Sequence, residues 1–157
     1  MSKFSLIAMG GTFDIIHHGH ITLLSTAFDI SEKVIIGLTS DEFVQKKGKN
    51  PIHKYDERLK NLISVIFHKF PNTNFEISQL NNDFGPAVFE KEVQALVVSD
   101  ETKNQGNILN KLRIERNLSP VEIIVVPMTL AKDGKKISTT RIKNSEIDSD
   151  GNLLPID

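Results

Sequence analysis

A turn of glycines and histidines is the part of the sequence best suited to chemistry. Gly10 and Gly11 follow an apolar run, and His17 and His20 precede a segment with helical spacing. A glycine turn lets the backbone approach a ligand closely, and the free N–H groups at a helix start favour an anion. Histidines beside that anion add hydrogen-bond donors or positive charge. The spacing therefore favours an enzyme that handles phosphate over a fold that only binds a nucleotide.

Two other interpretations of this turn stay open. It lacks the Gly-x-Gly-x-x-Gly spacing of dinucleotide-binding folds, so it could be an ordinary strand-to-helix turn with surface histidines. His17, His18 and His20 could instead bind zinc. The chain has no cysteine, and no remote carboxylate obviously completes such a ligand set. We therefore expect no metal ion held by protein side chains.

A second group of polar residues lies near the end of the chain. Ser138, Thr139 and Thr140 offer hydroxyl and N–H groups at the start of a predicted short helix. Such a helix start is a natural cap and can also seat a triphosphate. Capping alone and phosphate binding are equally good explanations of these residues. The glycine–histidine turn adds weight to phosphate binding.

A lysine-rich stretch, residues 45–49, follows an expected strand. We expect a loop over residues 39–49 whose lysines close over phosphate, although such stretches are just as often solvated surface loops. The pattern does not indicate which lysine matters. Arg58 could point its guanidinium into the same cleft, or pair with an acidic neighbour on a helix surface.

Strands and helices alternate along the chain and must position these residues. Apolar runs predict strands over Phe4–Met9, Val34–Leu38, Phe75–Ile77, Leu96–Ser99 and Glu122–Pro127. Helical spacing predicts helices over His20–Ile30, Tyr55–Phe70 and Thr102–Asn117, with a short last helix near Ser138.

Continuous rather than alternating apolar runs favour a parallel sheet that is buried on both faces. The order of elements predicts a Rossmann-like α/β fold, a doubly wound parallel five-stranded sheet with helices on both faces. Ligands of such sheets bind beyond the carboxyl ends of the strands. The segments 10–20, 39–49 and 99–106 should therefore converge on one cleft.

The bulk properties limit the class of protein. The 157 residues fit a single domain over residues 1–157, with a polar tail at 148–157 that we expect to be loosely held. A net charge of −1 argues against nucleic-acid binding by general electrostatics. No apolar stretch approaches the ~20 residues of a membrane span, and no signal-peptide pattern is present, so we expect a cytoplasmic protein.

The sequence resembles a known superfamily. Gly11-Thr12-Phe13-Asp14 followed by His17-x-Gly19-His20 is similar to the signature of the nucleotidylyltransferases, and Ile137–Thr140 resembles their second signature. Further segments resemble the archaeal and eukaryotic branch of the phosphopantetheine adenylyltransferases within that superfamily. These segments are Gly37–Asp41, Val97–Thr102, Asp133–Ser138 and Glu146–Asp148.

This resemblance implies reversible adenylyl transfer from ATP to 4′-phosphopantetheine, giving dephospho-coenzyme A and pyrophosphate in coenzyme A biosynthesis. Mg²⁺ would be carried by ATP. The attacking group is already a phosphate oxyanion, so positioning and preorganised donors can replace a strong general base. The alternatives are a glycerol-3-phosphate cytidylyltransferase, an FMN adenylyltransferase and a non-catalytic module that senses adenylates. The sequence does not indicate the oligomeric state or feedback by coenzyme A.

The resemblance also implies residue roles. His20 would stabilise the pentacovalent α-phosphate, His17 would contact the ATP phosphates, and Thr12 would orient the attacking phosphate. The other implied ATP-binding residues are Gly10, Gly11, Phe13, Val98, Ser99, Glu101, Ile137, Ser138, Thr139 and Thr140. The acceptor phosphate would be held by Thr12, Arg58 and one of Lys46 and Lys47.

Overall fold

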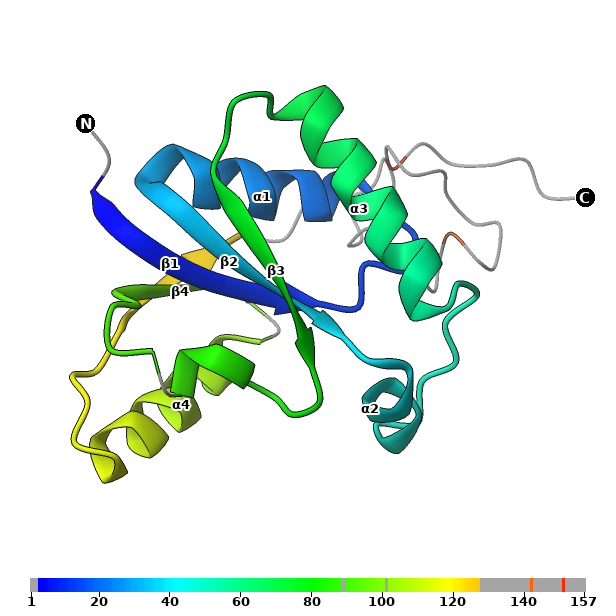
Figure 1. The fold of residues 1–157 in the computed structure, drawn as a ribbon. Coiled ribbons are helices and arrows are strands. Elements are labelled where there is room, and N and C mark those ends of the chain that lie inside the picture. Colours follow the sequence, from blue (N-terminus) through cyan, green and yellow to red (C-terminus); the bar gives the residue numbers. More distant parts are fainter. Residues whose placement is uncertain (1–2, 89, 101, 128–141, 143–150, 152–157) are drawn as a thin grey trace, which may run out of the picture.

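Five parallel strands form one sheet in the computed structural model, which describes residues 3–88, 90–100, 102–127, 142 and 151 (Figure 1). The strands are β1 Phe4–Gly11, β2 Ser31–Thr39, β3 Phe75–Leu80, β4 Ala95–Ser99 and β5 Glu122–Val126. Their spatial order is β3-β2-β1-β4-β5, and every neighbouring pair is parallel. The predicted five-stranded Rossmann-like sheet is confirmed.

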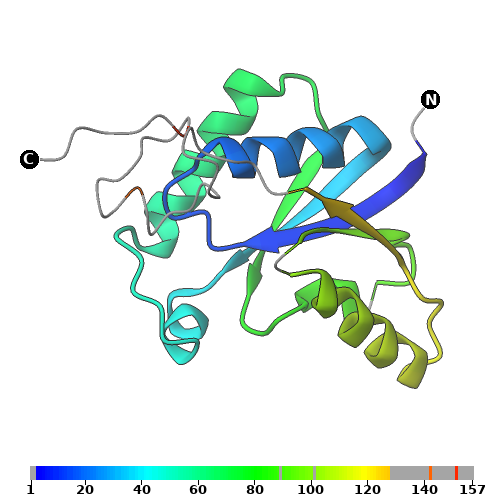
Figure 2. The ribbon, with the colours of Figure 1, turned by 180° about the vertical axis from the view of Figure 1, so that it is seen from behind.

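Helices cover both faces of this sheet. Helices α1 (His18–Ile30) and α3 (Tyr55–Lys69) pack on one face, and α4 (Lys103–Glu115) packs on the other with the 3-10 turn η1 (Gly85–Val88). Figures 1 and 2 show this arrangement from opposite sides, with the short helix α2 (Asp41–Lys46) beyond the end of β2. No helix in the described part of the chain has the length and apolar character needed to span a bilayer.

Successive side chains of each central strand pack on opposite faces of the sheet. In β1, Ile7 and Met9 pack beneath α1 and α3, whereas Ala8 packs toward α4. In β4, Val97 and Val98 divide between the same two faces. Successive side chains of a strand point to opposite faces, so a strand buried on both sides needs a continuous apolar run. Each large aliphatic side chain buried in this way contributes about 1.5–3 kcal/mol.

Local capping explains where the elements differ from the predictions. Helix α1 begins at His18 because His17 is its N-cap. The predicted loop over 39–49 was wrong for residues 41–46, which form α2. Ser40 accepts a hydrogen bond from the Phe43 N–H at 3.1 Å as N-cap, and acidic residues occupy the first turn. The predicted helix near Ser138 and the tail at 148–157 lie outside the described residues.

Candidate active site

A cleft opens at the carboxyl ends of the strands, beside β1, which separates β2 from β4 in the sheet. Segments from β1, from the β2–α2 region and from the start of α4 all line it, as predicted for 10–20, 39–49 and 99–106. The lining includes Gly10, Gly11, Thr12, Gly37, Thr39, Phe43, Lys47, Lys49, Leu80, Asp83, Phe84, Pro86, Val98, Thr102 and Gln105. His17 and His20 are not part of this lining. They lie at the start of α1, which packs on the other face of the sheet.

Glycine is needed on the floor of the cleft. A Cβ atom on Gly37 would lie 2.7 Å from the Leu80 side chain, and one on Gly10 would lie 3.2 Å from the Gly37 carbonyl oxygen. Larger residues would therefore displace Leu80 or close the space above β1 and β2. The glycines keep the end of the sheet open to a ligand.

The two histidines cap helix α1 reciprocally. The His17 Nδ1 accepts a hydrogen bond from the Gly19 N–H at 3.1 Å, and the His20 Nδ1 accepts one from the His17 N–H at 3.2 Å. A backbone nitrogen can only donate, so both Nδ1 atoms must be unprotonated. In a neutral imidazole the proton then sits on Nε2. Each ring thus keeps one N–H donor for a ligand.

The surroundings favour this neutral form. Burial, aided by the charge of His18, lowers the pKa of His17 to about 4. Burial, aided by His17, lowers the pKa of His20 to about 3. The two rings stack with their centroids 3.9 Å apart, and Phe13 lies 5.0 Å from His20. The sequence left open whether these histidines donate as neutral or charged groups, and the structure favours neutral donors.

The turn between β1 and α1 is fixed by two neighbouring residues. Phe13 is buried with a positive φ of 50°, a left-handed conformation that costs about 1–3 kcal/mol in a non-glycine residue. Asp14 is also buried, and its carboxylate accepts hydrogen bonds from the N–H groups of Ile52 and His53, each at 2.9 Å. The His53 ring lies 3.1 Å from the same carboxylate. These contacts tie the segment before α3 to the turn.

Arg58 does not have the position expected of a phosphate ligand. Its side chain is fully buried and donates to the carbonyl oxygens of Thr12, Thr39 and His53 at 2.8–3.1 Å. It also forms an ion pair with Asp41 at 2.9 Å. Four contacts occupy most of the five N–H donors of a guanidinium. The prediction that Arg58 contacts the acceptor phosphate is corrected: this residue positions the ends of β1 and β2.

The structure separates the two candidate lysines. Lys47 lines the cleft, whereas Lys46 is not among the lining residues. The Lys47 ammonium forms an ion pair with Asp83 at 2.9 Å and lies 4.6 Å from the centre of the Phe43 ring. Lys49, which the sequence did not single out, also lines the cleft.

The remaining predicted site residues divide into two groups. Val98 lines the cleft, and Ser99 lies just beyond it with its hydroxyl 3.2 Å from the Thr102 hydroxyl. Glu101 and the segment Ile137–Thr140 lie outside the described residues. Within the described ranges no group of three histidine, aspartate or glutamate side chains could hold a metal ion.

Sequence reasoning missed the residues that hold the turn in place. Asp14 was noticed only as part of the glycine–histidine signature, and His53 was given no role. Their contact spans 39 residues of sequence. No short-range pattern carries such a contact, although an aspartate inside a glycine turn is a recognisable candidate for binding backbone N–H groups.

Comparisons with known proteins define the class to which this site belongs. A family model described as Cytidylyltransferase-like matches residues 8–145. A phosphopantetheine adenylyltransferase of Methanopyrus kandleri is 36% identical over 148 residues, covering 94% of each chain. The enzyme of the same name from Pyrococcus horikoshii is 41% identical over 156 residues, covering 98% of each chain.

A solved structure of a protein of unknown function from Archaeoglobus fulgidus superposes with a TM-score of 0.70 at 27% identity, covering 78% of this chain and 89% of that one. The chain belongs to the cytidylyltransferase-like family of nucleotidyltransferases, and within it to the group of the archaeal phosphopantetheine adenylyltransferases.

Proposed function

We propose that the chain transfers the adenylyl group of ATP to 4′-phosphopantetheine, reversibly, to give dephospho-coenzyme A and pyrophosphate in coenzyme A biosynthesis. The observation that carries the proposal is the pair of histidines, His17 and His20, that cap helix α1 directly after the glycine end of β1. Relatives about 40% identical over nearly the whole chain, named for this reaction, support the choice of acceptor.

The residues suit this chemistry because the nucleophile needs no deprotonation. A phosphate oxygen of the acceptor forms a bond to the α-phosphorus of ATP. The bond from that phosphorus to the bridging oxygen breaks, and its electron pair leaves with pyrophosphate. The transferring group carries more charge on its oxygens at the transition state, and the neutral Nε2–H donors of His17 and His20 can stabilise that charge. Bound phosphates would also raise the pKa of both rings and strengthen their hydrogen bonds.

The two substrates would meet at the turn between β1 and α1. ATP would bind along Gly10–Phe13, with its phosphates near His17 and His20 and its adenosine near Val98 and Ser99. The resemblance adds Glu101 and Ile137–Thr140 to this set. Mg²⁺ would arrive with ATP, held mostly by phosphate oxygens and water, and would neutralise phosphate charge.

The acceptor would occupy the cleft. Its phosphate would bind near Thr12 and Lys47, and Lys47 is preferred over Lys46 because only Lys47 lines the cleft. The apolar arm of the acceptor would contact Leu80, Phe84 and other apolar lining residues. Arg58 fixes the position of Thr12 by donating a hydrogen bond to its carbonyl oxygen at 3.0 Å.

Pyrophosphate release tests the proposal against its alternatives. The protein is incubated with Mg²⁺-ATP and 4′-phosphopantetheine, with CTP and glycerol 3-phosphate, and with ATP and FMN. Release in the first mixture alone, with formation of dephospho-coenzyme A, is the expected result. Release in another mixture would change the substrates but keep the reaction class. ATP binding without release in any mixture would favour the adenylate-sensing module. The cytoplasmic location stays a prediction.

A further inference from the structure

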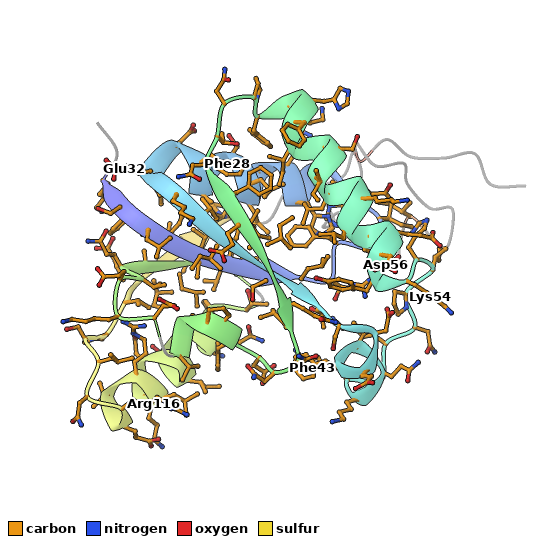
Figure 3. All side chains as sticks on the ribbon, in the orientation of Figure 1. Phe28, Glu32, Phe43, Lys54, Asp56 and Arg116 are labelled. Atoms are coloured by element: carbon orange, nitrogen blue, oxygen red, sulfur yellow. The ribbon has the colours of Figure 1, made fainter. Side chains whose placement is uncertain are left out.

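An ion pair spans two walls at the mouth of the cleft. Lys47 is the C-cap of α2, and Asp83 lies on the segment that follows β3. Their charged atoms are 2.9 Å apart, and both residues line the cleft. The side chain of Phe43, a residue of α2, points toward the end of β3 in Figure 3, and its ring centre is 4.6 Å from the Lys47 ammonium. The cation that best fits the acceptor phosphate is therefore already held by a carboxylate.

This pair can exchange partners readily. The two side chains are 37% and 51% exposed, and ion pairs in contact with water contribute little to stability. A phosphate group carries up to two negative charges and offers more acceptor oxygens than one carboxylate. It can therefore displace Asp83 from Lys47, but only against the attraction that Asp83 exerts.

The segment that carries Asp83 also carries apolar lining residues. Phe84 and Pro86 line the cleft within three residues of Asp83. The Asn82 side chain holds this segment in a turn by accepting hydrogen bonds from the N–H groups of Phe84 at 3.2 Å and Gly85 at 2.7 Å. A ligand with an apolar arm contacts this segment directly. A small anion without an arm meets Lys47 while Asp83 still holds it.

We propose that Asp83 is a specificity-determining residue that competes with the acceptor phosphate for Lys47. This competition weakens binding of small anions, which have only the Lys47 contact to gain, more than binding of a phosphate that carries an apolar arm. The inference rests on the proposed function, because it takes the cleft as the acceptor site.

The test compares Asp83→Asn with the unchanged protein. We expect the KM for 4′-phosphopantetheine to fall by about two- to fivefold, the range expected for an exposed ion pair. The inhibition constant of inorganic phosphate against the acceptor should fall by a larger factor than this KM, and an equal or smaller fall would contradict a role in specificity. The inhibition constant of unphosphorylated pantetheine should not change, since it has no group that competes for Lys47. Glu76→Gln is the matched control, because Glu76 pairs with Lys33 on the surface at 3.5 Å.

A double-mutant cycle shows whether Asp83 acts through Lys47. In a Lys47→Ala background, Asp83→Asn should leave the KM for 4′-phosphopantetheine unchanged. An unchanged or raised KM in the single variant, or an equal fall in the Lys47→Ala background, would overturn the inference while leaving the proposed function intact. If the unchanged protein releases no pyrophosphate with 4′-phosphopantetheine, the proposed function fails and the inference fails with it.

Discussion

Two buried arginines, one on each face of the sheet, hold different parts of the candidate site in place. Arg58 lies on α3 and Arg113 on α4, and these helices lie on opposite faces of the sheet (Figure 1). The two residues are 0% and 1% exposed, and each donates to several backbone carbonyl oxygens. The partners of Arg58 are the carbonyls of Thr12, Thr39 and His53 and the carboxylate of Asp41. The partners of Arg113 are the carbonyls of Ala87, Glu90, Val93 and Ser119.

The two arginines differ in the charge of their partners and in the segments that they connect. Arg58 has an acidic partner, whereas no carboxylate in the described part of the chain lies within ion-pair distance of Arg113. Burial lowers the pKa of the Arg113 guanidinium from its usual value. Arg58 connects the ends of β1 and β2, which carry the reacting turn. Arg113 holds Ala87, Glu90 and Val93 next to the apolar wall of the cleft. We therefore expect Arg58 to govern the rate and Arg113 to govern acceptor binding.

The largest effect is expected from Arg58→Met. The change leaves the carbonyl oxygens of Thr12, Thr39 and His53 without their donor, and the loss of these hydrogen bonds should cost about 3–5 kcal/mol in total. Asp41 is 44% exposed and keeps its contact with the Tyr55 N–H, so the ion pair itself adds little. We expect the free energy of unfolding to fall by about that total in chemical denaturation. We also expect kcat to fall by about ten- to a hundredfold, because the turn loses its position. Lys33→Met, which removes an exposed pair, should change stability by less than about 1 kcal/mol.

Arg113→Lys should have a smaller effect on stability and a different effect on kinetics. A lysine keeps the charge but cannot reach all four carbonyls, so we expect a loss of about 2–3 kcal/mol. The KM for the acceptor should rise by about threefold or more, roughly the effect of a 0.6 kcal/mol loss in binding. The KM for ATP and kcat should change by less than about twofold. A fall in kcat with an unchanged acceptor KM would contradict the division of roles between the two arginines.

Asp14→Asn tests one set of contacts in the turn that Arg58 also holds. The amide can accept only one of the two backbone hydrogen bonds through its oxygen, and its NH₂ group faces the other N–H. We expect a loss of about 1–2 kcal/mol. Hydrogen exchange at the Ile52 and His53 amides should accelerate, while amides of β4 keep their protection. Equal acceleration throughout the molecule would indicate global destabilisation instead.

The smallest effect is a dependence of stability on pH that arises from the histidine turn. The folded pKa values of His17 and His20, about 4 and about 3, lie below the unfolded value of 6.5. The unfolded chain therefore binds more protons, and stability is lost as pH falls from about 6.5 toward the folded values. Between pH 7 and pH 6 the two rings should cost about 1 kcal/mol together. His17→Gln should remove about half of this slope, and an unchanged slope would show that other groups cause it.

The sequence predicted the elements of the site better than the contacts between them. Apolar runs located every strand of the sheet, and the continuous runs in β2 and β5 indicated that the sheet is parallel. The turn at Gly10–His20 was recognised because its residues are adjacent. Most partners of Arg58, Asp14 and Arg113 lie 17–46 residues away in the sequence, and such partners follow from packing alone.

Helix α2 could have been predicted from the sequence. Ser40 followed by two acidic residues is a typical helix start, and it was passed over because the lysines after it suggested a loop. The fully buried state of Arg58 had no such signal, since an arginine on an amphipathic helix is usually exposed.

The central claim is that the histidine turn stabilises the transferring phosphate, and steady-state kinetics of His20→Ala test it most directly. Pyrophosphate release is measured with both substrates varied. The account predicts that kcat falls by about 10²–10³ while the KM for ATP changes by only a few-fold, because the His20 contact is strongest in the transition state. An unchanged kcat with a raised KM for ATP would show that His20 only binds the nucleotide, and would contradict the account.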